Sequence, residues 1–190
     1  MQFKKICWLV LLLLITAPVF AQRKRQRQSA GFREFTRITN QANLAFNVPD
    51  GFKEVSNKQN RLSFDYGIAL PGQEFEIWFR VIPEQNDSMT DSLYIDVGKI
   101  EAKSLAGDAN YFMRGMPPEV ISDYNADTGR TFLINLPDSP TTKHYKYALL
   151  ITLQKKKSGT VMAVCFTNDK GPDFFQNINK ARSCMKFRPI

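Results

Sequence analysis

The stretch RLSFDYGIALPGQEFEIWFRVIP, residues 61–83, decides the fold of this chain. Large apolar side chains stand at every second position from Leu62 to Leu70 and again from Phe75 to Val81. A period of two is typical of a strand that buries one face, and the Pro71-Gly72 pair between the two runs favours a tight turn. The stretch therefore predicts an antiparallel hairpin. Its polar face would carry Glu74, Glu76, Trp78 and Arg80.

Further strands are predicted on both sides of this hairpin. Upstream, two short apolar runs flank the turn signal Pro49-Asp50-Gly51, which predicts a hairpin of residues 44–48 with residues 52–55. Downstream, apolar runs predict strands at residues 131–136, 145–153 and 160–167. The last two would be joined by a turn at residues 155–159.

Three segments have the spacing of helices instead. Apolar residues three and four apart predict a helix over residues 91–106, ended by Gly107, and another over residues 172–186. Pro117-Pro118 can open a short helix that runs to Ser122, because proline suits a first helical turn. Sequential hairpins with helices to cover them predict the α+β class, with an antiparallel sheet of about six or seven strands covered by helices.

The N-terminus has the composition of an export signal. Lys4 and Lys5 precede an apolar run of 14 residues, Ile6–Val19, which leads into the small-x-small site Val19-Phe20-Ala21. We therefore divide the chain into a signal peptide at residues 1–21, a basic and flexible leader at residues 22–40 and a single domain at residues 41–190. Cleavage near Ala21 would export the protein to the periplasm or the cell exterior. The alternative is a retained membrane anchor, because more basic residues follow the apolar run than precede it. These basic residues are Arg23, Lys24, Arg25 and Arg27.

The formal net charge of +8 is concentrated near the N-terminus. Two of these charges belong to the predicted signal and four lie between Gln22 and Gln28, which leaves +2 for the rest of the chain. This distribution argues against nucleic-acid binding, which needs a basic stripe across the folded surface. The basic leader could touch an anionic membrane surface, or it could simply be solvated.

Nothing in the sequence forms a catalytic constellation. It contains neither a nucleophile-elbow motif nor a glycine-rich phosphate loop. The oxygen-bearing residues Asp123, Asn125 and Asp127 alternate as in a calcium loop, but the glycine and the glutamate that such a loop requires are not in place, so a turn is the favoured interpretation. His144 is the one histidine and cannot form a multi-histidine zinc site. We therefore expect no enzyme activity, no metal and no cofactor.

Two features leave alternatives open. Cys165 and Cys184 remain after the signal is removed, and they could form a disulfide in an oxidising compartment or stay as buried free thiols. Trp78 and Arg80, together with the basic leader, could mark an interaction surface, or Trp78 could be buried under a helix.

Three segments carry a resemblance to a known family. They are FNVPDGFKEV at residues 46–55, the hairpin at residues 61–83 and VMAVCFTNDKGPDFFQNINKARSCMKF at residues 161–187. In their order and hydrophobic pattern they resemble the PsbP and Ran-binding Mog superfamily, including its DcrB-like exported bacterial members. The resemblance implies an α/β/α sandwich that acts by binding other molecules. We therefore expect an exported, non-enzymatic domain that binds a protein or a cell-envelope component. The alternative is a small-molecule or lipid carrier in the envelope, which would need an enclosed apolar cavity.

Overall fold

The computed structural model describes residues 29–56, 64–84 and 92–190. The predicted signal peptide and the basic residues Arg23, Lys24, Arg25 and Arg27 lie outside these ranges, as does the start of the strand predicted from Leu62. In the described part of the chain, no helix is long and apolar enough to span a membrane.

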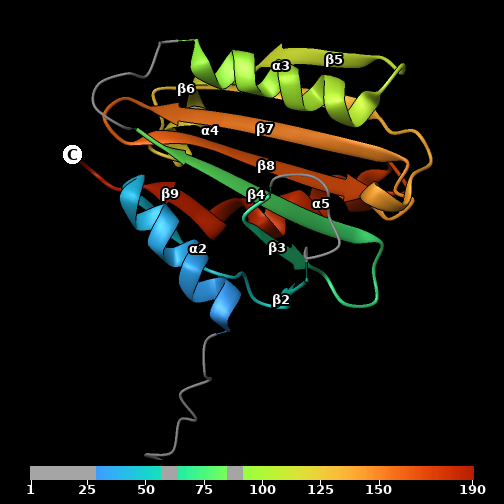
Figure 1. The fold of residues 1–190 in the computed structure, drawn as a ribbon, viewed down its shortest axis with the longest axis horizontal. Helices are drawn as coiled ribbons and strands as arrows, with labels where there is room; N and C mark the ends of the chain where they lie inside the picture. Colours follow the sequence, from blue (N-terminus) through green and yellow to red (C-terminus); the bar gives the residue numbers. More distant parts are fainter. Residues whose placement is uncertain (1–28, 57–63, 85–91) are drawn as a thin grey trace, which may run out of the picture.

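A seven-stranded antiparallel sheet forms the centre of the domain (Figure 1). Its strands, in spatial order, are β2 (Lys53–Glu54), β3 (Tyr66–Ala69), β4 (Phe75–Pro83), β8 (Gly159–Thr167), β7 (Tyr147–Lys155), β6 (Thr128–Asn135) and β5 (Tyr111–Gly115). The predicted hairpin is confirmed as β3 and β4, with Tyr66 opposite Phe79. The predicted hairpin of β7 and β8 is confirmed as well.

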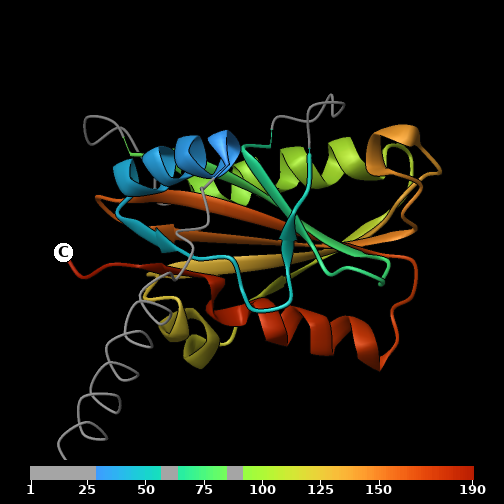
Figure 2. The same cartoon turned by 90° about the horizontal axis from the view of Figure 1, so that it is seen from below.

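Helices cover both faces of this sheet. Helix α3 (Leu93–Ala106) lies on one face, above β6 and β7, while α4 (Pro118–Asp123) and α5 (Pro172–Ala181) lie on the other (Figure 2). Two buried apolar clusters result, one on each face. The α3 side includes Trp78, Phe132, Leu150 and Phe166, and the opposite side includes Phe35, Ile68, Phe79, Leu153 and Phe187. The predicted α+β class and the α/β/α arrangement are therefore confirmed.

Residues 30–40 form a helix, although the sequence analysis assigned them to a flexible leader. They belong to helix α2 (Ala30–Gln41), whose first turn is capped by the Ser29 hydroxyl, which accepts a hydrogen bond from the Phe32 N–H. Phe35 is 1% exposed and stacks on the Tyr66 ring with centroids 4.9 Å apart. The expectation of a flexible leader is thus wrong for these residues, because an apolar stripe docks the helix on β3 and β4.

The segments at the two ends of the domain differ most from the prediction. Strand β1 (Leu44–Phe46) pairs with β9 (Met185–Phe187) and not with residues 52–55, so the expected first hairpin is wrong. The C-terminal helix ends at Ala181, short of the predicted residue 186, and a 3₁₀ turn leads from it into β9. The backbone N–H of Phe187 donates to the Tyr124 carbonyl and fastens this ribbon over the sheet.

Candidate functional site

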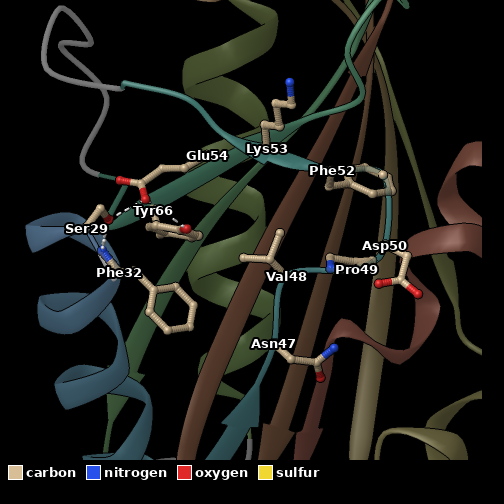
Figure 3. Close-up of a pocket in the computed structure, with 11 residues that line it drawn as sticks. Ser29, Phe32, Asn47, Val48, Pro49, Asp50, Phe52, Lys53, Glu54 and Tyr66 are labelled. Atoms are coloured by element: carbon tan, nitrogen blue, oxygen red, sulfur yellow. Dashed lines mark hydrogen bonds between the residues drawn. The ribbon is translucent and has the colours of Figure 1, made fainter. Parts of the chain in front are cut away.

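A pocket of about 700 Å3 opens at the β2 end of the sheet (Figure 3). We call it the α2–β2 pocket, because it lies between the start of α2, the loop after β1 and the edge strand β2. Its lining consists of Ser29, Phe32, Asn47, Val48, Pro49, Asp50, Gly51, Phe52, Lys53, Glu54 and Tyr66.

The turn at Pro49-Asp50-Gly51 positions one wall of this pocket. The Phe52 N–H donates to the Pro49 carbonyl at 3.1 Å, and Gly51 adopts a φ of 83°, which favours glycine. Phe52 is buried and meets the Phe75 ring edge-on at 6.2 Å. The turn predicted from sequence is therefore present, but it carries the chain from β1 to the edge of the sheet.

On the other wall of the pocket, hydrogen bonds join three side chains, those of Ser29, Glu54 and Tyr66. The Tyr66 hydroxyl donates to Glu54 Oε2 at 3.2 Å, and the Ser29 hydroxyl bonds the same carboxylate (Figure 3). Burial raises the pKa of Tyr66, and the nearby Glu54 charge raises it further, so the phenol remains a neutral donor. Glu54 is exposed, while Phe32 is half-buried beside it. The pocket thus combines an apolar floor with a carboxylate rim that also includes Asp50.

The structure does not confirm Trp78 as part of an interaction surface. Trp78 is 0% exposed and belongs to the buried cluster on the α3 side, where its ring meets those of Phe64 and Phe166 with centroids 5.7 and 4.4 Å away. Its indole N–H donates to Glu76 Oε2 at 2.9 Å, and the Lys143 ammonium lies 2.7 Å from the same oxygen. Arg80 lies on the same side, 3.8 Å from Glu101. Neither residue contributes to the α2–β2 pocket.

The two remaining cysteines are buried free thiols, so the proposed disulfide is not formed in this structure. Both line an interior void of about 20 Å3 between α5 and the sheet, together with Tyr124. This void is about the size of one water molecule, so it cannot hold the lipid that the carrier alternative requires. Burial raises the pKa of the Cys165 thiol and raises that of Cys184 to about 12.

The residues Asp123, Asn125 and Asp127, which alternate as in a calcium loop, each bond to a different part of the protein. Asp123 pairs with Arg182, Asn125 Nδ2 donates to the Phe187 carbonyl at 2.9 Å, and Asp127 Oδ2 accepts from the Lys156 N–H at 2.8 Å. The turn interpretation is therefore confirmed. His144 is exposed, with its Nδ1 2.6 Å from Asp138 Oδ1. Among the residues with described positions, no three His, Cys, Asp or Glu side chains are grouped to hold a metal.

Comparisons with known proteins give a likeness of structure only. No protein-family model matches this chain, and no curated protein matches it in sequence. The solution structure of cyanobacterial PsbP from Synechocystis sp. PCC 6803 is similar, with a TM-score of 0.49. The two chains are 12% identical over 77% of this chain and 88% of that chain. The likeness concerns the fold alone, and no residue role is transferred from it.

Sequence reasoning missed the residues that build the α2–β2 pocket. Ser29 and Phe32 lie in the stretch that we assigned to the leader, and Glu54 lies in a strand whose partner was misassigned. A signal was present, because serine followed by apolar residues at helical spacing, Phe32, Phe35 and Ile38, is typical of a capped amphipathic helix.

Proposed function

We propose that this protein is an exported, non-enzymatic domain that binds a protein or a cell-envelope component at the α2–β2 pocket. The observation that carries this proposal is the composition of the pocket: buried Phe52 and Tyr66 form its floor, while Glu54 and Asp50 stand exposed at its rim. A floor of this kind takes an apolar or aliphatic group. At the rim the two carboxylates outnumber the one cation, Lys53, so the net negative charge favours a ligand with positive charge.

The α2–β2 pocket has the volume of a ligand site and is open to solvent, so it can take a group that projects from a larger partner. A pocket of about 700 Å3 is within the ordinary range for ligand sites, which is roughly 300–1,000 Å3. The Tyr66 and Ser29 hydroxyls are already bonded to Glu54, so the wall that a partner would meet is held in place before binding. The carrier alternative needs an enclosed apolar cavity, and the void of about 20 Å3 between α5 and the sheet is far too small for a lipid.

Site-specific photocrosslinking tests the location of binding. A photoreactive amino acid at the exposed position Lys53, on the pocket rim, should capture a partner in the native envelope. The matched control places it at exposed Lys103 on α3, which lies on the other face of the sheet. Replacing Phe32 with Glu should abolish capture from position 53. Equal capture from both positions, or capture that survives Phe32→Glu, would contradict the proposed site.

The N-terminus of the protein recovered from cells tests export. We expect a mature chain that begins at Gln22 and is found outside the cytoplasm, as the signal in residues 1–21 predicts. A full-length chain held in the membrane fraction would favour the retained anchor. Neutral substitution of Arg23, Lys24, Arg25 and Arg27 should weaken binding to anionic vesicles, and unchanged binding would contradict a contact between the leader and an anionic surface.

A further inference from the structure

Strand β5 forms the far edge of the sheet from the α2–β2 pocket. It pairs with β6 from Tyr111 opposite Ile134 to Gly115 opposite Arg130, and in the described part of the chain no strand pairs with its other side. The opposite edge strand, β2, has only two residues. The five residues of β5 are therefore the longer free edge of this sheet.

The alternation of hydrogen bonds identifies the backbone groups that face outward. Directly after β5, the Met116 N–H donates to the Gly129 carbonyl at 3.4 Å, in the same register as the strand. In an antiparallel pair the bonded residues alternate, so Arg114 and Phe112 bond to β6. The free edge then carries the backbone N–H and C=O groups of Tyr111, Met113 and Gly115. These groups can form hydrogen bonds with one more antiparallel strand.

The side chains of this edge are unusually apolar for a free strand. Phe112 is 71% exposed and Met113 is 41% exposed, and as successive residues they project on opposite faces of the sheet. Natural sheets protect free edges with charges, proline or very short strands. Within β5, Arg114 is the one charged residue, so this protection is weak.

We propose that β5 pairs antiparallel with β5 of a second copy of this chain, about a two-fold axis at Met113. In this register Tyr111 lies opposite Gly115 of the partner subunit, and Phe112 lies opposite Arg114 of the partner subunit. A guanidinium over a phenyl ring gains a cation–π contact. The Tyr111 ring already packs on Phe132, and Gly115, which lies next to Arg130 of its own subunit, brings no side chain that would clash with that ring across the axis. The sequence YFMRG is thus complementary to its own reverse, which is what a two-fold interface demands.

Charge variants at the axis provide the principal test, performed on the chain from Gln22, which includes every described residue. Met113→Lys places like charges opposite each other across the axis, and Met113→Glu does the same with the opposite sign. We expect the wild type to sediment as a dimer at high micromolar concentration, each variant alone as a monomer, and an equimolar mixture of the two as a heterodimer. Recovery in the mixture shows that both variants are folded.

Two further measurements make the proposal falsifiable. Phe175→Lys alters another exposed apolar side chain, 53% exposed on α5, and should leave the dimer intact. Met113→Cys treated with oxidised glutathione, which accepts the two electrons, should form an intersubunit disulfide, because a bonded antiparallel pair has Cα atoms about 5.5 Å apart, within the range for a disulfide. Lys103→Cys, at an exposed position on α3, is the control and should not crosslink. A monomeric wild type, or a dimer that survives Met113→Lys, would overturn the proposal.

Discussion

At the scale of single residues, the most constrained group is the set of contacts that Lys143 makes with Glu76 and Trp78. Lys143 bonds both oxygens of the nearly buried Glu76 carboxylate, at 2.9 and 2.7 Å, and lies 5.6 Å from the centroid of the Trp78 ring. Lys143 and the following His144 both have positive φ, 54° and 62°. A left-handed conformation costs such residues about 1–2 kcal/mol each. The ion pair and the cation–π contact offset this strain.

Removing the ammonium should therefore destabilise the domain. Lys143→Met keeps the aliphatic chain but leaves the Glu76 carboxylate with fewer partners, and we expect the free energy of unfolding to fall by about 1–2 kcal/mol. Urea titration of the chain from Gln22, followed by Trp78 emission, measures this, since the other tryptophan, Trp8, lies outside that chain. Lys99→Met, at an exposed position on α3, is the control. Adding Glu76→Gln should restore part of the loss, and a Lys143→Met protein as stable as wild type would refute the ion-pair argument.

Glu101 should make stability depend on pH. Burial raises the pKa of this carboxyl, while the nearby Arg80 charge lowers it less. The folded state therefore binds a proton more tightly than the unfolded state, so the Glu101 contribution is fully present below the unfolded pKa and is lost as pH rises through the folded pKa. Glu101→Gln removes this term. Its unfolding free energy relative to wild type should rise between pH 4 and pH 7, and a constant difference over that range would contradict the assignment.

At the scale of elements, the sequence pattern predicted those strands that pair with a neighbour along the chain. The alternation at Tyr66–Leu70 and Phe75–Val81 and the turn between them led directly to β3 and β4, because a hairpin is specified by neighbouring residues. The pairing of β1 with β9 joins Leu44 to Phe187 and leaves no local signal. Strand β5 was missed because it is an edge strand with four exposed residues and no alternation of burial.

The candidate site was less predictable than the fold for the same reason. The sequence marks the Pro49-Asp50-Gly51 turn, but the α2–β2 pocket exists only because α2 docks on Tyr66 and brings Ser29 to Glu54. For Trp78 the sequence left two alternatives open, an interaction surface or burial. Burial is confirmed, because Trp78 belongs to the apolar cluster on the α3 side of the sheet and is 0% exposed.

Close approach of α3 to the sheet gives a prediction at this scale. A Cβ on Gly98 would lie 2.5 Å from Phe132 Cε2 and 3.0 Å from Thr152 Cγ2, both in the buried layer. Gly98→Ala should therefore destabilise the domain by about 1–3 kcal/mol through overpacking, although alanine favours helices by about 1 kcal/mol. Ser104→Ala, at an exposed site on the same helix, should be neutral or slightly stabilising. A more stable Gly98→Ala protein would show that the helix can shift away from the sheet.

At the scale of the whole molecule, the two free thiols report on how its layers separate. Cys165 lies in β8, with strands paired on both sides, whereas Cys184 lies in the 3₁₀ turn between α5 and β9. Residues at the end of a chain are exposed by smaller openings than residues of a central strand. Both thiols line the same void. Phe79, Tyr124 and Ile151 also line it and do not belong to α5, the 3₁₀ turn or β9, so they stay around Cys165 when the C-terminal segment detaches.

We therefore expect the thiols of the chain from Gln22 to react with an aromatic disulfide reagent in two phases. Burial raises the pKa of both thiols, so neither reacts until an opening exposes it. The fast phase belongs to Cys184, because releasing α5 and β9 leaves the seven-stranded sheet intact, and the slow phase belongs to Cys165 at the rate of global unfolding. Cys184→Ser should retain the slow phase alone, and Cys165→Ser the fast phase alone. A single phase that both variants share at the global unfolding rate would show instead that the β1–β9 ribbon joins the C-terminal segment and the sheet into one cooperative unit.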